Sequence, residues 1–141
     1  MTGKSFVDTN VLIYAHNLDA GAKRELARSV LAELWRERRG ILSMQVLQEF
    51  YVNVTRKIPV PISKNSARII VEAYALWCVE STPAEISAAF RIEDETGISF
   101  WDAMIVACAV KGGAERILSE DLNAGQRIAG VLIENPFAAA Q

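Results

Sequence analysis

Residues 6–13 read FVDTNVLI, and this stretch decides the fold class. Two apolar runs flank the polar triplet Asp8-Thr9-Asn10. The first run is long enough for a short buried strand, and the second begins a helix directly after it. A strand followed at once by a helix is typical of parallel sheets covered by helices. Asp8 would then lie at the carboxyl end of a strand, which is where such sheets bind ligands.

The rest of the chain repeats this alternation without a linker long enough to mark a domain boundary. Further strands are predicted at 41–43, 78–80, 116–119 and 131–134. Long helices are predicted at 22–39, 44–57, 63–77, 82–96 and 99–111, with an extended linker at 58–62, IPVPI. The pattern predicts an α/β fold, a three-layer α/β/α sandwich with a central parallel sheet. A single domain over residues 1–141 is expected.

Composition narrows the functional classes. The chain has 141 residues, 51% of them hydrophobic, and a formal net charge of −2, as in an ordinary globular domain. Its apolar run at 103–110 is too short to span a membrane, and no signal peptide is evident, so a cytoplasmic protein without a membrane partner is expected.

Cys78 and Cys108 form no metal motif, and we expect two buried thiols. The single histidine, His16, is expected on the surface at a helix end and is accompanied by no nucleophile motif.

Three further carboxylates occupy positions comparable to that of Asp8. Glu49 lies at the border of the apolar stripe of its helix, where a carboxylate usually reaches solvent. Asp102 lies in the first turn of a helix that is otherwise apolar on all sides, and Ser99-x-x-Asp102 is also a capping box. Asp121 follows a strand and could cap a short helical turn, and its neighbour Glu120 competes for the same role. Each residue alone has a structural explanation.

Their joint placement is harder to explain by structure alone. Two follow strand ends and two lie on helices that begin just after strands, so all four are expected at one end of the sheet. Two carboxylates about 5 Å apart repel each other by about 3 kcal/mol at an effective dielectric constant near 20. A cluster therefore requires protonation or a cation. Oxygen ligands without His or Cys favour Mg²⁺, with Mn²⁺ as the second choice, and such ions suit displacement at phosphorus.

Basic residues are concentrated between Lys23 and Arg68. Interspersed glutamates favour solvated helix faces, whereas a contact with the phosphate backbone of RNA would also explain the concentration. We expect a groove toward the acidic site for RNA or a protein partner, bordered by Trp35, Arg36, Arg38, Arg39 and Tyr51.

Four blocks of sequence resemble PIN-domain ribonucleases, specifically the VapC-type toxins of bacterial and archaeal toxin–antitoxin pairs. The blocks are FVDTNVLIY, LSMQVLQEFYVN, SFWDAMIVACA and ILSEDLNAGQRIAGVLIENPF, in the family's order and over nearly the full chain. The resemblance implies the strand order 3-2-1-4-5. It also implies that a divalent metal is held by Asp8, Glu49, Asp102 and Asp121, and it favours Asp121 over Glu120. Asn10 and Ser119 fall where the family keeps residues that support these ligands.

The function implied by the resemblance is a Mg²⁺-dependent endoribonuclease that a cognate antitoxin neutralises, with a toxin homodimer. Asp8 and Asp102 would be the principal metal ligands. The alternatives are a PIN-domain nuclease outside a toxin–antitoxin pair and a non-catalytic RNA-binding PIN domain. Phosphoryl transfer through an aspartyl phosphate is disfavoured for two reasons. Haloacid-dehalogenase hydrolases carry a second aspartate two residues after the nucleophile, where this chain has Asn10. Response receivers use a lysine on a late strand, whereas Lys111 lies at a helix end.

Overall fold

A mostly parallel sheet forms the centre of the computed structural model, which describes residues 3–138. Its strands are β1 (Lys4–Val7), β2 (Gly40–Ser43), β3 (Cys78–Val79), β4 (Ala114–Leu118), β5 (Arg127–Ile128) and β6 (Val131–Glu134). They lie in the order β3-β2-β1-β4-β6-β5, and only β5 pairs antiparallel, with β6. The predicted parallel order is confirmed. The additional edge strand β5 has two residues, too few to produce a recognisable alternation.

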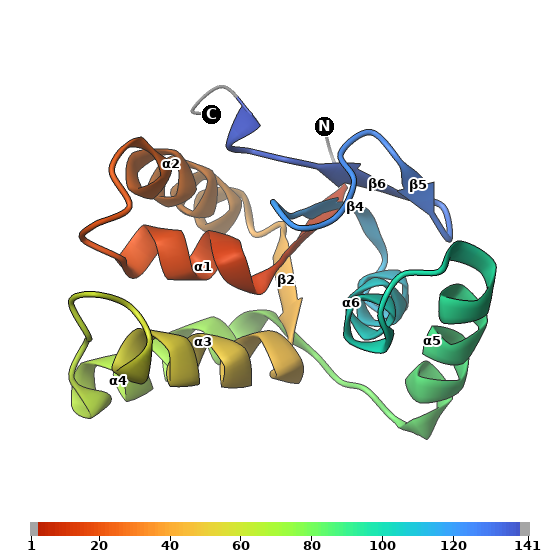
Figure 1. Ribbon diagram of the computed structural model, residues 1–141, viewed down its shortest axis with the longest axis horizontal. Helices are drawn as coiled ribbons and strands as arrows, with labels where there is room; N and C mark the ends of the chain where they lie inside the picture. The colour runs from red at the N-terminus through yellow and green to blue at the C-terminus, as the bar shows by residue number, and fades with distance from the viewer. Residues whose placement is uncertain (1–2, 139–141) are drawn as a thin grey trace.

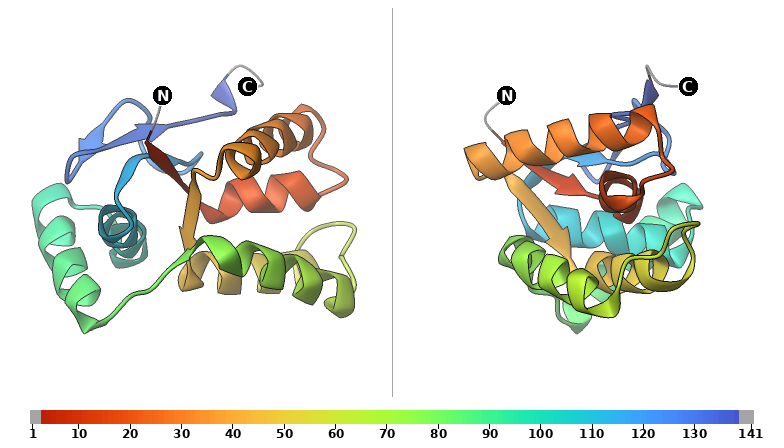
Figure 2. Two further views of the ribbon diagram at one scale, coloured as in Figure 1. Left: turned by 180° about the vertical axis from the view of Figure 1, so that it is seen from behind. Right: turned by 90° about the vertical axis from the view of Figure 1, so that its left-hand side faces the viewer.

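Helices cover both faces of the sheet. They are α1 (Thr9–His16), α2 (Ala22–Glu37), α3 (Met44–Arg56), α4 (Lys64–Tyr74), α5 (Pro83–Thr96) and α6 (Phe100–Lys111), with a 3₁₀ turn η1 (Ala75–Trp77). Figure 1 shows α1 to α4 on one side of the sheet and α5 and α6 on the other, and Figure 2 shows the same layers from behind. The three-layer sandwich is therefore confirmed. Within residues 3–138, no helix is both long and apolar enough to cross a membrane.

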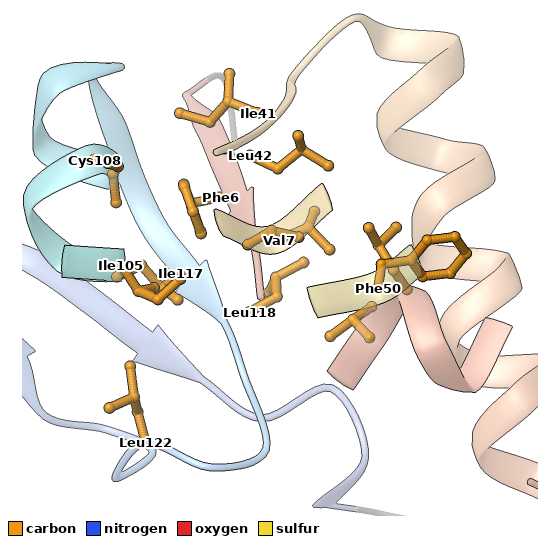
Figure 3. Packing of buried hydrophobic residues seen from close by; sticks show 14 of the residues in the cluster. Phe6, Val7, Ile41, Leu42, Phe50, Ile105, Cys108, Ile117, Leu118 and Leu122 are labelled. Carbon is orange, nitrogen blue, oxygen red and sulfur yellow. The ribbon is translucent and has the colours of Figure 1, made fainter. Parts of the chain in front are cut away.

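The core joins the sheet to both helical layers. Phe6 and Leu42, on neighbouring strands, are fully buried. Figure 3 shows Phe50 of α3 on one side of these strands and Ile105 and Cys108 of α6 on the other. Burial of such side chains is the main favourable term in folding. The core therefore fixes where α3 and α6 begin relative to the ends of the strands.

The connections between parallel strands give the sheet two functionally different ends. The side where β1, β2 and β4 finish is called the carboxyl end, and the side where they start is called the amino end. The helices α1 and α3 begin directly after β1 and β2, so their first turns lie at the carboxyl end. The helix α6 runs toward the start of β4, so its own first turn also lies at the carboxyl end.

By the same reasoning, α2 ends at the amino end, because it leads from β1 back to the start of β2. Two residues near the end of α2, Trp35 and Arg38, accordingly line a cavity of about 530 Å³ together with Lys4 and Gly40, the first residues of β1 and β2. This placement separates the basic end of α2 from Asp8.

Candidate active site

Asp8 is a buried carboxylate at the carboxyl end of β1. It is the N-cap of α1, and its Oδ1 accepts a hydrogen bond of 2.7 Å from the backbone N–H of Thr9. Its Oδ2 accepts a bond of 2.7 Å from the hydroxyl of Ser119, which follows β4. Only 6% of Asp8 is exposed. The side chain is therefore held rigidly from two neighbouring strands.

The electrostatic environment of Asp8 is unfavourable for its charge. Burial raises its pKa from 3.8 to about 6, although the hydrogen bonds from Ser119 and Thr9 lower the pKa. The negative charges of Asp121 and Asp102 raise the pKa further. An N-cap alone does not require an aspartate in such a place, because Ser or Asn caps a helix without a buried charge. The carboxylate calls for an explanation beyond capping.

All four predicted carboxylates line one pocket of about 230 Å³ at the carboxyl end of the sheet. Glu49 of α3 is exposed, and its Oε1 accepts a hydrogen bond of 2.7 Å from the hydroxyl of Thr9. Asp121 is also exposed, and its Oδ2 accepts a bond of 3.0 Å from the Nδ2 of Asn10. The structure thus brings together side chains from four separate segments of the chain.

Asp102 does not complete a capping box. Its backbone N–H donates to the hydroxyl of Ser99 over 3.1 Å, which caps α6. Among residues 3–138, however, the Asp102 carboxylate accepts no hydrogen bond from a side chain or from the backbone of Ser99. The carboxylate lines the pocket instead. Its oxygens are therefore available to a ligand.

Glu120 is directed elsewhere. Its carboxylate accepts a hydrogen bond from the Tyr14 hydroxyl and forms an ion pair with Lys23. Asp121, the next residue, lines the pocket. The geometry thus agrees with the preference for Asp121 over Glu120 that the resemblance implied.

Two predicted supporting residues occupy their expected place. Ser119 is fully buried, and besides donating to Asp8 its hydroxyl accepts hydrogen bonds from the backbone N–H groups of Asp121 and Leu122, over 3.1 and 3.3 Å. Asn10 holds Asp121 and also accepts a bond of 3.3 Å from the N–H of Glu120. One hydroxyl and one amide therefore position the loop after β4.

Other residues of the pocket were not identified from the sequence. Thr9, Gln45, Asn53 and Trp101 all line it. Gln45 and Trp101 stand in the first turns of α3 and α6, so the strand and helix boundaries already contained the signal for them. Asn53 stands one helical turn after Glu49 and donates to its backbone carbonyl over 2.8 Å.

The donor set fits a hard divalent cation. Carboxylate oxygens surround the pocket, and neither His nor Cys lines it. Within the described part of the chain, no group of three or more His, Cys, Asp or Glu is arranged to hold one ion. Mg²⁺ is compatible with this spacing, because it usually takes one or two protein carboxylates and completes its shell with water and substrate phosphate.

The predicted basic groove is corrected by the structure. Trp35, Arg36, Arg38 and Arg39 belong to the end of α2 and to the residues after it, at the amino end of the sheet. The two pockets that Trp35, Arg36 and Arg38 line share no residue with the acidic pocket. The right-handed return of α2 is the physical reason, because it carries these side chains away from Asp8.

Two other predicted positions also differ. Tyr51 does not line the acidic pocket; its ring lies 6.0 Å from the guanidinium of Arg68. His16, expected on the surface, is half-buried, and its ring centroid lies 5.5 Å from that of Phe50. Burial lowers the pKa of His16, and the charges of Arg28 and Arg24 lower it further. Helix α4 folds over this position, a tertiary contact that the local sequence does not encode.

Comparisons with known proteins identify the fold. Residues 5–130 match the family model of the PIN domain. A crystal structure of DNA-bound VapBC from Salmonella typhimurium is similar, with a TM-score of 0.65 and 19% identity, over 95% of this chain and 98% of that one.

A second solved structure, VapBC2 from Rickettsia felis bound to a promoter DNA fragment, has a TM-score of 0.61 and 17% identity, over 93% of this chain and 97% of that one. No curated protein matches the chain. With sequence identities below 20%, the two solved structures show a shared fold and no more. The family model, in contrast, covers most of the chain. The chain belongs to the PIN-domain family.

Proposed function

We propose that this protein is a Mg²⁺-dependent endoribonuclease and the toxin of a toxin–antitoxin pair. One observation carries the proposal: the buried carboxylate of Asp8 lines the same pocket as Glu49, Asp102 and Asp121. A folded protein keeps a buried charge next to other like charges where function requires it. In a PIN domain, that function is nuclease chemistry.

Asp8 and Asp102 are the proposed principal ligands of the ion, and Mn²⁺ could replace Mg²⁺. Glu49 and Asp121 would complete the site or orient the attacking water. When bound, a divalent ion supplies positive charge to the phosphate oxygens and makes nearby water more acidic. No protein nucleophile is required.

The chain's own residues provide orientation and accept a proton. With a pKa of about 6, Asp8 is mostly ionised at neutral pH, and Ser119 and Thr9 fix its two oxygens. In the proposed hydrolysis, water adds at phosphorus, the bond to one ribose oxygen breaks, and that oxygen leaves as a hydroxyl after taking a proton from solvent. Glu49 or Asp121, both exposed on the pocket wall, takes the proton that the water loses.

A cognate antitoxin and a homodimer complete the proposal, together with action in the cytoplasm. The two solved structures named above are VapBC complexes, which supports a protein partner. We place the antitoxin contact at a mostly apolar pocket where α1, α2 and α4 meet, lined by His16, Arg28, Trp35, Arg36 and Tyr74 among others. The two arginines would favour an amphipathic segment that carries acidic side chains.

The direct test is cleavage of single-stranded RNA by the purified chain, first with Mg²⁺ and then with EDTA. We expect cleavage that requires the ion and stops when the antitoxin is added. Ion-dependent cleavage that the neighbouring gene product does not inhibit would support a PIN-domain nuclease outside a toxin–antitoxin pair. RNA binding without cleavage under any divalent ion would contradict the proposed activity and favour an RNA-binding domain.

A further inference from the structure

Trp101 is an exposed aromatic side chain on the wall of the acidic pocket. It is 63% exposed, although α6 is otherwise largely buried. It directly precedes Asp102 and lines the pocket that also contains Asp8. Burying a tryptophan is strongly favourable, so one left in water beside a polar site is a candidate for ligand contact.

The indole is supported from behind. The ring of Phe100 packs against it edge to face, with centroids 5.2 Å apart, and Phe90 of α5 lies 5.8 Å from Phe100. On the backbone side, Gln45 Nε2 donates to the Trp101 carbonyl over 3.4 Å, which links α6 to α3. These contacts restrict the position of the ring while most of its surface remains open.

We propose that Trp101 is a stacking platform for one base of single-stranded RNA, next to the phosphate that is cleaved. The inference rests on the proposed function, because a phosphate bound near Asp8 and Asp102 brings its nucleotide against this wall of the pocket. Unpaired bases stack on aromatic side chains whatever their sequence. Bases inside a duplex are already stacked and cannot use the platform, so the site would select unpaired RNA.

A second copy of the chain is the competing occupant, because Met44 and Phe90 are also more than half exposed, at 58% and 51%. The cores of protein interfaces are depleted of charged residues. Trp101, in contrast, shares its pocket with four carboxylates and three amide side chains. The polar surroundings favour a nucleotide over an apolar protein surface.

The test compares Trp101→Ala and Trp101→Phe with Trp77→Phe. Trp77 is a suitable control because it lines the cavity at the amino end of the sheet, which shares no residue with the acidic pocket. One readout is the KM for a single-stranded RNA with Mg²⁺. The second is quenching of tryptophan fluorescence by the same RNA with Ca²⁺ in place of Mg²⁺. The fluorescence readout does not require cleavage, so it tests the platform even if the proposed nuclease activity fails.

We expect Trp101→Ala to raise the KM about tenfold, the size of one lost stacking contact, with a smaller effect on kcat. Trp101→Phe should keep the KM within about twofold, because a phenyl ring still stacks, yet lose the quenching that Trp77→Phe retains. An unchanged KM for Trp101→Ala, or normal quenching in Trp101→Phe, would overturn the inference. So would conversion of a dimer to a monomer by Trp101→Ala in light scattering, because it would assign this face to a second copy.

Discussion

The two ends of the sheet carry cavities of opposite character. The cavity at the amino end is the larger, about 530 Å³ against about 230 Å³ at the carboxyl end. Its two tryptophan side chains pack on each other, with the ring centroids of Trp35 and Trp77 5.0 Å apart. At the carboxyl end, by contrast, Asp8 is a buried charge that packing does not require. The chemistry of the lining, rather than cavity size, distinguishes the candidate site.

The amino end also shows how packing explains its own residues. Gly40 leaves room for the Trp77 ring, since a Cβ there would lie 2.6 Å from that ring. Arg39 donates hydrogen bonds to Glu37 and, over 3.1 Å, to the Gly3 carbonyl. These contacts account for Trp77 and Arg39 without a ligand.

Removing one central carboxylate should have the largest effect. Asp8→Asn or Asp102→Asn is expected to lower RNA cleavage by about a hundredfold or more, the usual loss when a central electrostatic group is removed. Initial rates with Mg²⁺ measure the effect. Asp19→Asn, on an exposed loop, is a matched control and should cleave normally. Normal rates in both site variants would remove the basis for the proposed metal site.

The buried charge of Asp8 should appear in the stability of the metal-free protein. Its pKa is raised from 3.8 to about 6 on folding, so its charge opposes folding at neutral pH. Below pH 3.8 Asp8 is protonated in both states, and its ionisation does not oppose folding. As pH rises from 3.8 through about 6, the ionisation of Asp8 lowers the free energy of unfolding by about 3 kcal/mol.

Urea unfolding in EDTA, compared between wild type and Asp8→Asn across this pH range, isolates the contribution, because the other titrating groups are common to both proteins. Asp8→Asn should be the more stable protein at neutral pH. A difference between the two proteins that does not change with pH would contradict the raised pKa.

The support behind Asp8 should have a moderate effect. Ser119→Ala removes one hydroxyl that donates to Asp8 and accepts from two backbone N–H groups. We expect the free energy of unfolding to fall by about 2 kcal/mol, because buried polar groups lose their partner. Ser66→Ala on the exposed face of α4 is the control and should change little. If the two variants are equally stable, the network does not hold Asp8.

The smallest effect is expected at the amino end. Replacing Arg36 and Arg38 together with glutamine should leave RNA affinity, and its dependence on salt, unchanged within about twofold. Filter binding at two salt concentrations measures both. A weaker affinity with a shallower salt dependence would show that RNA reaches this end of the sheet, and the groove predicted from the sequence would then be restored.

The sequence was sufficient for those features that depend on the order of elements. Strand ends and helix starts placed Asp8, Glu49, Asp102 and Asp121 at one end of the sheet, because in a parallel sheet all carboxyl ends meet there. The same logic, applied to the return of α2, would have placed Arg36 and Arg38 at the other end. The predicted groove rested instead on the basic cluster beside Trp35 and on the extended linker at 58–62.

Other features depend on tertiary contacts that no local pattern contains. The burial of His16 arises from contact with Phe50 and Tyr74, on two other helices. The hydrogen bond from Thr9 to Glu49 joins residues 40 positions apart. Such details require the packed structure.

Binding of a divalent ion should depend on the carboxylates at the carboxyl end of the sheet. Mn²⁺ bound to the purified protein can be measured by electron paramagnetic resonance, for wild type, for Asp8→Asn and for the double variant Arg36→Gln, Arg38→Gln. We predict saturable binding in wild type and in the arginine variant, competition by Mg²⁺, and loss of binding in Asp8→Asn. Equal Mn²⁺ binding by wild type and Asp8→Asn would contradict the account, because the ion would then lie somewhere other than the carboxyl end of the sheet.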